Sequence, residues 1–84
     1  MTGKLAISRA GHDRDTIYVI TGEDASSVYL ADGRIRTVEK PKRKNKKHIQ
    51  IIQELPQETA QLLSQDRAPG NEEIKRAIKL YNRR

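Results

Sequence analysis

Residues 40–48 are the feature of this 84-residue chain that most restricts its fold. Six Lys or Arg residues fall in this run and no Asp or Glu lies among them: Lys40, Lys42, Arg43, Lys44, Lys46 and Lys47, with His48 at the end. An unpaired charge in a protein core is strongly unfavourable, so the run cannot supply core side chains. Blocks of like charge are often flexible interaction arms, and we expect this one to lie in solvent or against a polyanion. A solvated linker is the simpler alternative.

The rest of the composition places this positive charge on a small scaffold. Residues 1–39 hold five Lys or Arg against six Asp or Glu, whereas residues 40–84 hold twelve against five. A chain of this length with 35% hydrophobic residues, no Phe and no Trp can form one modest core. A phosphate backbone, a nuclear-import receptor or an anionic membrane would each suit the basic half.

Several classes of protein are disfavoured by what the sequence lacks. Without cysteine there is neither a disulfide framework nor a thiolate metal site, which suits a reducing compartment. The longest apolar run, residues 17–20, is far short of the ~20 residues of a membrane span, and the N-terminus has no signal-peptide pattern. We therefore expect a cytoplasmic protein without membrane contact, monomeric when free.

Five short β-prone segments precede residue 54, and they occupy residues 4–7, 16–21, 27–31, 34–38 and 49–53. The dipeptide Asp32-Gly33 favours a type I′ turn, so the third and fourth segments are predicted to pair as a tight hairpin. Five short strands in about fifty residues predict a small, curled antiparallel barrel.

Two helices are predicted after the strands. Pro56 suits the first turn of one helix, whose apolar face would be Ala60, Leu62 and Leu63. Asn71 can cap a second helix in which apolar residues recur at helical spacing: Ile74, Ala77, Ile78 and Tyr81. The expected organisation is a barrel over residues 1–53, including the basic run 40–48, and a helical extension over residues 54–84 packed on it.

Candidate catalytic groups are scarce. The two imidazoles, His12 and His48, both lie in charged segments, and no set of nucleophile, base and orienting group is evident. Asp13 and Asp15, or Glu23 and Asp24, could hold a hard cation, although such acidic pairs without further oxygen ligands at set spacing are more often turn residues. A Walker loop and dinucleotide-type glycines are absent. We expect no enzymatic activity, no metal and no cofactor.

The segment Leu5-Ala6-Ile7-Ser8-Arg9-Ala10-Gly11-His12-Asp13-Arg14, followed by Tyr18-Val19-Ile20-Thr21-Gly22, resembles a KOW motif. Gly11 would permit a tight loop with positive φ, or a close approach of the backbone to phosphate. A wider pattern, through residues 32–33, 39–42 and 71–74, resembles small bacterial KOW-domain RNA-binding proteins. These are similar to the KOW-type large-subunit ribosomal proteins of archaea and eukaryotes. Asp15 stands where many KOW loops have a second glycine.

The resemblance implies an SH3-like barrel whose KOW loop and neighbouring basic segment contact RNA. Carried over by position, it implies RNA-binding roles for Arg9, Gly11, His12, Asp13 and Arg14. The charge of the basic run independently nominates Lys40, Lys42, Arg43, Lys44, Lys46 and Lys47, to which we add the adjoining His48. The alternative for the loop is ordinary hairpin construction, in which Arg9 and Arg14 pair with Asp13 and Asp15.

The kind of RNA follows from the scarcity of aromatic residues. Tyr18 and Tyr29 could stack on bases, but packing between strands is the more frequent role of such residues. Structured RNA recognised through its backbone and shape therefore fits best. The resemblance to KOW proteins implies that this RNA is ribosomal, with ribosomal proteins as neighbours. Lys75, Arg76, Lys79 and Arg83 could also face phosphate, although a solvated, salt-bridged helix face is favoured over that interpretation.

Two other functions remain open from the sequence alone. The domain could recruit a protein such as RNA polymerase or a translation factor, with the basic run only holding the pair near RNA. It could also be a small nuclease that uses Asp13 and Asp15 with a divalent ion.

Overall fold

A computed structural model describes residues 2–53, 55, 57–63 and 69–82 of the chain. Along the chain the elements are β1 (Leu5–Ser8), β2 (Ile17–Glu23), β3 (Ser27–Ala31), β4 (Lys42–Asn45), the 3-10 helix η1 (Lys46–His48), β5 (Ile49–Ile51), α1 (Gln57–Leu63) and α2 (Asn71–Asn82). The mainly β fold, its five antiparallel strands and the two C-terminal helices confirm the prediction from the sequence.

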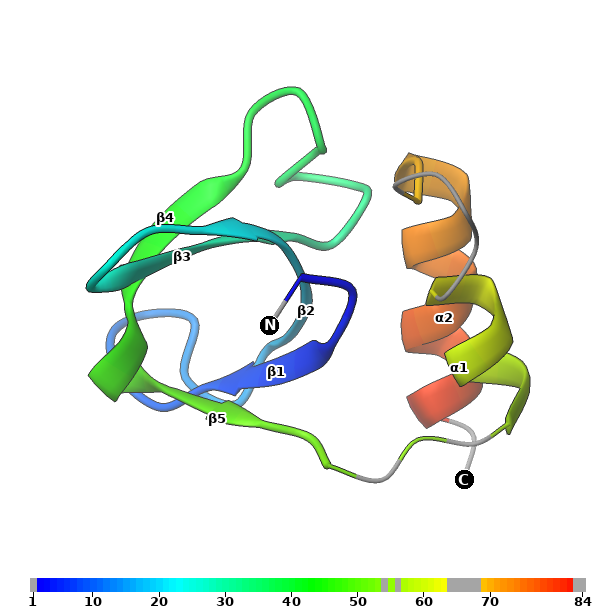
Figure 1. The fold of residues 1–84 in the computed structure, drawn as a ribbon, viewed down its shortest axis with the longest axis horizontal. Coiled ribbons are helices and arrows are strands. Elements are labelled where there is room, and N and C mark those ends of the chain that lie inside the picture. The colour runs from blue at the N-terminus through cyan, green and yellow to red at the C-terminus, as the bar shows by residue number, and fades with distance from the viewer. Residues whose placement is uncertain (1, 54, 56, 64–68, 83–84) are drawn as a thin grey trace.

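The strands form one open sheet in the order β4-β3-β2-β1-β5. The sheet curls strongly, and the two helices lie side by side against one side of it (Figure 1). Strands β4 and β5 are its two edges, and η1 connects them within the described part of the chain. The predicted closed barrel is therefore replaced by a curled sheet with two edges.

Apolar side chains of the central strands point alternately to the two sides of the sheet, so both of its faces are apolar. Leu5 is paired with Val19 in the β1–β2 ladder, and both belong to the cluster that faces the helices. The next pair, Ala6 and Tyr18, points to the opposite face, where Ile20, Val28 and Leu30 complete a second cluster. Since successive side chains of a strand point to opposite faces, both sides of these short strands are buried.

Helix α2 covers the first of these faces with its apolar stripe. Ile74 and Ala77 are fully buried in the cluster of Leu5 and Val19, and Ile78 and Tyr81 pack at its margin. A helix of this length is marginal alone in water, so this burial supplies most of its stability.

The start of α2 differs from the prediction that Asn71 is its cap. The Ile74 amide donates to the Gly70 carbonyl at 3.0 Å, which makes Gly70 the cap residue, and Glu73 Oε1 accepts from the Gly70 amide at 3.0 Å. The Asn71 side chain turns instead to the segment before β4. Its Oδ1 accepts from the Val38 amide at 2.8 Å. Pro56, placed by the sequence at the start of the other helix, lies outside the described residues.

The predicted strand over residues 34–38 is wrong, and so is the hairpin at Asp32-Gly33. Residues 33–36 form bends, and Asp32 Oδ1 accepts hydrogen bonds from the amides of Arg34 and Arg36, each at 2.9 Å. Asp32 and Gly33 in turn donate their amides to the Arg36 carbonyl. Such local bonding by an aspartate competes with a strand ladder, and here it consumes the backbone groups that a hairpin would need.

The strand that actually pairs with β3 comes from the basic run. In this ladder Val28 is opposite Lys44, Tyr29 is opposite Arg43 and Leu30 is opposite Lys42. The expectation of a flexible charged arm is therefore wrong for residues 42–45. Lysine is depleted in strands, so the local signal for β4 was weak, and the pairing depends on contacts made by distant residues.

Candidate nucleic-acid interface

The loop between β1 and β2, residues 9–16, is tightly turned. Gly11 has a φ of +85°, as its sequence position led us to expect, and Asp15 has a φ of +72°. Aspartate is one of the few residues that tolerate this left-handed conformation, so Asp15 can stand where glycine would be favoured. Two backbone hydrogen bonds across the loop, from Asp15 to the Ser8 carbonyl at 2.8 Å and from Thr16 to the Asp13 carbonyl at 2.9 Å, fix its shape.

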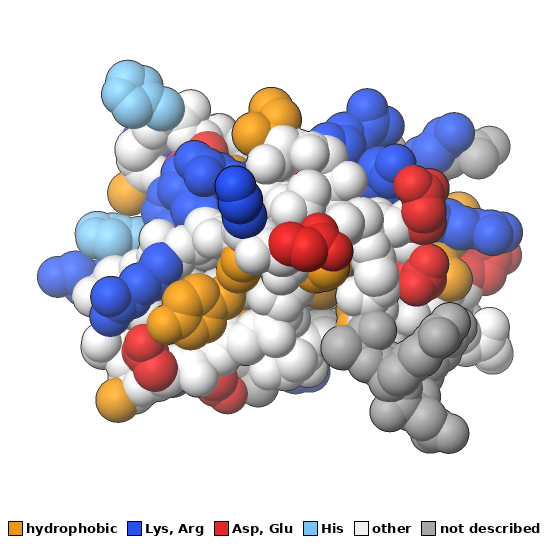
Figure 2. Space-filling view, turned by 90° about the horizontal axis from the view of Figure 1, so that it is seen from above, with side chains coloured by type: hydrophobic (Ala, Val, Ile, Leu, Met, Phe, Trp, Pro, Cys, Tyr) orange, Lys and Arg blue, Asp and Glu red, His pale blue; other side chains and the backbone are white. Residues whose placement is uncertain are grey.

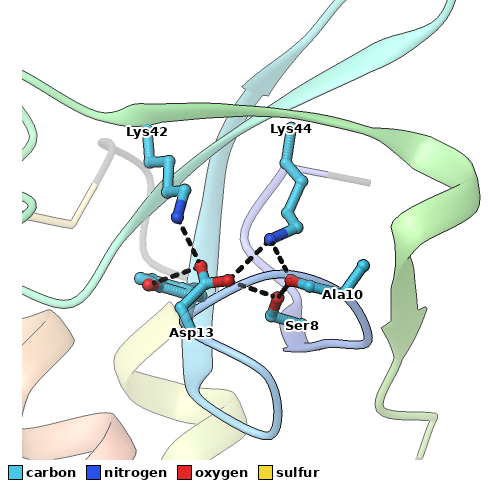
Figure 3. A network of polar contacts seen from close by, with 6 residues as sticks. Ser8, Ala10, Asp13, Lys42 and Lys44 are labelled. Atoms are coloured by element: carbon cyan, nitrogen blue, oxygen red, sulfur yellow. Dashed lines mark hydrogen bonds and ion pairs between the residues drawn. The ribbon is translucent and has the colours of Figure 1, made fainter.

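Asp13 is the centre of a polar network that joins this loop to β4 (Figure 3). Its carboxylate accepts four hydrogen bonds, from Lys44 Nζ at 2.7 Å, Lys42 Nζ at 2.8 Å, Ser8 Oγ at 2.9 Å and the Tyr18 hydroxyl at 2.9 Å. Lys44 Nζ also donates to the Ala10 carbonyl at 2.8 Å. We call the five residues Ser8, Asp13, Tyr18, Lys42 and Lys44 the Asp13 network.

The Asp13 network is largely removed from solvent. The exposed fractions of the side chains are 13% for Asp13, 10% for Lys44 and 27% for Lys42. Burial disfavours the ionised carboxylate, but the hydrogen bonds from Lys42 and Lys44, with Ser8 and Tyr18, outweigh it and hold the pKa of Asp13 well below its usual range. Burial, together with its hydrogen bond to Asp13, raises the pKa of Tyr18 to about 12. Two ammonium groups share one carboxylate, so the network keeps a positive charge.

Other carboxylates reach two more cations of the basic run. Lys46 Nζ lies 2.9 Å from Glu23, and the Arg43 guanidinium lies 3.7 Å from Asp24. Four of its six Lys and Arg residues thus have acidic partners, although the linear sequence places no acid among them. The inference that the run's charge is uncompensated was wrong because every one of these acids comes from another strand or loop.

Several cations of the same region keep substantial solvent exposure. The side chain of Arg43 is 64% exposed, and that of Arg9 is 47% exposed, with its guanidinium 3.6 Å from Asp15 and donating also to Gln50. Arg14, Lys47 and His12 are exposed, and none of them takes part in an ion pair among the described residues.

Loop 9–16 and the end of the basic run form one continuous surface. The Arg9 amide donates to the His48 carbonyl at 2.7 Å, and Lys44 contacts both Ala10 and Asp13. In the space-filling view both histidines lie at the end of the molecule away from the helices, with Lys and Arg side chains beside them (Figure 2). We define the loop–β4 surface by the polar residues that line it: Arg9, His12, Arg14, Arg43, Lys46, Lys47 and His48.

The structure thus separates the residues nominated from the sequence into three groups. Those of the loop–β4 surface retain at least partial exposure, and the backbone contact of Arg9 with His48 joins loop 9–16 to η1. Arg43 alternates with Lys42 and Lys44 along β4, so it points to the other face of the strand, toward Asp24. Asp13, Lys42 and Lys44 are internal, and Gly11 adjoins them, since a Cβ at Gly11 would lie 3.8 Å from Lys44 Nζ. Lys40 lies before β4, where its amide donates to the Thr37 carbonyl, and no contact of the described residues joins it to loop 9–16.

Sequence reasoning missed four residues that shape this region: Ser8 and Tyr18 as partners of Asp13, and Glu23 and Asp24 as partners of the basic run. For the inward position of the two lysines, one signal was available. Lys42 and Lys44 are spaced by two, which puts both side chains on one face if residues 42–45 form a strand.

The suggested cation site at Asp13 and Asp15 is not favoured by the geometry. Both oxygens of Asp13 are occupied by lysine, serine and tyrosine donors, and Asp15 faces Arg9. Across the described ranges no group of three or more His, Asp or Glu residues is arranged to hold a metal ion.

Comparison with known proteins gives no further guide. No protein-family model matches the chain, and no curated protein matches its sequence.

Neither α1 nor α2, the helices of the described residues, has the length and apolar character needed to cross a bilayer.

Proposed function

We propose that this chain is a non-catalytic KOW-type RNA-binding protein whose loop–β4 surface binds the backbone of structured RNA. The observation that supports this most is the Asp13 network. It fixes loop 9–16 against the basic strand, so that two segments distant in the sequence present their cations together on one rigid surface. A preorganised surface loses little conformational entropy when it binds.

The charge of this end of the molecule favours an anionic partner. Seven Lys or Arg residues of loop 9–16, β4 and η1 face four nearby carboxylates, those of Asp13, Asp15, Glu23 and Asp24. The pairs of Arg9 with Asp15 and of Arg43 with Asp24 are long and exposed. Exposed pairs contribute only about 0–1 kcal/mol, so a phosphate group can replace either carboxylate at small cost.

The tyrosines favour recognition of backbone and shape. Tyr18 is 4% exposed and donates to Asp13, and Tyr81 packs against the core cluster under α2. Neither offers a free ring for stacking on unpaired bases. Tyr29, the other stacking candidate, is partly exposed and its hydroxyl donates to Asp24 at 3.4 Å. One partly exposed ring is no platform for successive bases, whereas an array of cations suits the phosphates of a folded RNA.

The resemblance to KOW proteins supports the finer parts of the proposal. These are an SH3-like arrangement of the curled sheet, a cytoplasmic location, and binding as a monomer to ribosomal RNA on or near the large subunit, beside ribosomal proteins. The alternative of a module that recruits RNA polymerase or a translation factor differs in predicting a protein as the primary partner.

The salt dependence of RNA binding tests the surface directly. Counterion release lowers log K by about 0.7 to 0.9 per decade of salt for each phosphate contact. We expect the triple variant Arg14→Gln, Arg43→Gln, Lys47→Gln to bind a structured ribosomal RNA fragment more weakly and to flatten the slope by about 2 to 3. Lys40→Gln is the matched control, since it removes a charge of the same basic run outside the loop–β4 surface. A triple variant with the wild-type slope and affinity would refute the assignment.

Sedimentation tests the ribosomal part. In a low-salt gradient the tagged protein should travel with large-subunit particles, and high salt should release it because electrostatic contacts are screened. Recovery with RNA polymerase alone, unaffected by ribonuclease, would instead establish the recruitment function.

A further inference from the structure

The bend at residues 32–38 is held by several hydrogen bonds and displays an unusually exposed side chain. Ile35 is 85% exposed, whereas Asp32 binds the amides of both flanking arginines and Asn71 binds the Val38 amide. Gly33 has a φ of +80° and is so close to α2 that a Cβ there would lie 2.4 Å from the Asn71 carbonyl oxygen. An apolar side chain held in water by a well-anchored bend suggests a contact surface.

Basic residues of α2 adjoin this bend. A Cβ at Gly33 would lie 2.7 Å from Cγ of Lys75, and Arg34, Lys75 and Lys79 together line two neighbouring indentations between the bend and the helix. Arg76 lines the second of them. We define the α2–bend surface as Arg34, Ile35, Lys75, Arg76 and Lys79.

Most carboxylates around these cations already have partners. Glu58 lines a third indentation together with Arg76, but no ion pair joins the two residues. Asp32 accepts backbone amides, Glu73 accepts the Gly70 amide, and Glu72 pairs with Lys75 at 2.8 Å. Asp15, which lines the first indentation, faces Arg9. Arg34, Arg76 and Lys79 are exposed and have no acidic partner in the part of the chain that the structure describes.

We propose that the α2–bend surface is a second RNA contact, so that the protein bridges two RNA segments. The inference rests on the proposed function. Most of the second surface lies where the bend meets α2, whereas η1 lies at the end of the molecule away from the helices (Figure 1). The two surfaces adjoin at the first indentation, which Asp15 and Thr16 of loop 9–16 line together with Lys75 and Lys79. The longest dimension of the molecule is 28 Å, so cations that extend from η1 to α2 reach different strands or helices of a folded RNA.

The chemistry of the surface favours RNA over a protein partner. A protein interface is usually centred on buried aromatic anchors surrounded by a polar rim. Here a single exposed isoleucine follows Arg34 in the bend, and three of the four cations of the surface have no acidic partner among the described residues, which suits phosphates with one apolar contact to a sugar or base.

Co-capture of two RNA molecules tests the bridge. A biotinylated RNA stem-loop is immobilised, equimolar full-length protein is added, and retention of a fluorescent copy of the same stem-loop is measured. We expect wild type to retain the fluorescent RNA, and Arg34→Gln with Lys79→Gln to lower that retention about tenfold while still binding the immobilised RNA. The charge-preserving double variant, Arg34→Lys with Lys79→Arg, should keep most of the retention of the fluorescent RNA. Lys4→Gln, at an exposed cation that lines neither indentation, controls for net charge.

The outcomes separate the two proposals. Wild type that does not bind the immobilised RNA would overturn the proposed function and this inference with it. Wild type that binds but retains no second RNA, or a glutamine double variant that retains it as well as wild type, would overturn the bridge alone. Circular dichroism of each variant shows whether α2 is intact.

Discussion

Lys44 donates a hydrogen bond to Asp13 at 2.7 Å across 31 positions of sequence. The bond comes from an edge strand and points inward, to a carboxylate that also holds Lys42. Inward charges on an edge strand discourage pairing with another molecule, and here they also fix the loop beside them. The basic run is therefore part of the fold as well as part of the proposed RNA contact.

Removing the Asp13 charge should destabilise the fold. Asp13→Asn leaves two largely buried ammonium groups without a counter-charge, and breaking such pairs costs a few kcal/mol, so we expect a loss of about 2 to 4 kcal/mol in the free energy of unfolding. Urea denaturation followed by circular dichroism measures it. The control Arg43→Gln, at an exposed pair, should change the free energy by less than about 1 kcal/mol. Equal effects of the two variants would show that the Asp13 network is not structural.

The same network should make Asp13 resist protonation. Its folded pKa is lowered, so its contribution to stability is complete above the unfolded pKa of about 3.9 and is lost as the pH falls from there toward the folded value. An NMR titration of the side-chain carboxyl carbons of the folded protein should show Asp13 still ionised at about pH 3. A midpoint near 4 would mean that the lysine contacts do not persist in solution.

Gly33 should tolerate no side chain. Gly33→Ala combines a left-handed φ of +80° with a Cβ placed 2.4 Å from the Asn71 carbonyl oxygen, so we expect a loss of about 2 kcal/mol or more. In Gly22→Ala the new Cβ would meet Tyr29 at an ordinary 3.6 Å, and the variant should stay within about 1 kcal/mol of wild type. Thermal unfolding of the two alanine variants makes the comparison. Similar midpoints would show that the bend can move away from α2.

Each residue of the apolar stripe of α2 should contribute to the free energy of unfolding in proportion to how deeply it is buried. Ile74 is fully buried and Ile78 only partly, so we expect Ile74→Ala to cost about 2 to 4 kcal/mol and Ile78→Ala about half as much. Hydrogen exchange of the free wild-type protein should show protection from Ile74 to Leu80. Exchange there at random-coil rates would mean that the helix forms only on a partner.

The sequence by itself determined the elements whose signals are local. Four of the predicted strands, those that became β1, β2, β3 and β5, have β-branched or alternating apolar residues, and α2 has a clear helical period. The positive φ of Gly11 also followed from its place between two strands. Each of these has a signal contained within a few residues, so no distant contact had to be known to predict it, although packing on the sheet supplies most of the stability of α2.

Only the tertiary structure decided β4, the bend at residues 32–38 and the state of the basic run. Asp32-Gly33 is compatible with a hairpin, but Asp32 bonds its own neighbours and Asn71 holds the Val38 amide from 33 positions away. Lys42 and Lys44 lack strand propensity, yet a carboxylate from another loop gives them an interior role. Whether a charge is free or neutralised depends on which acids the fold brings within a few ångströms, and the linear order of residues does not contain those distances.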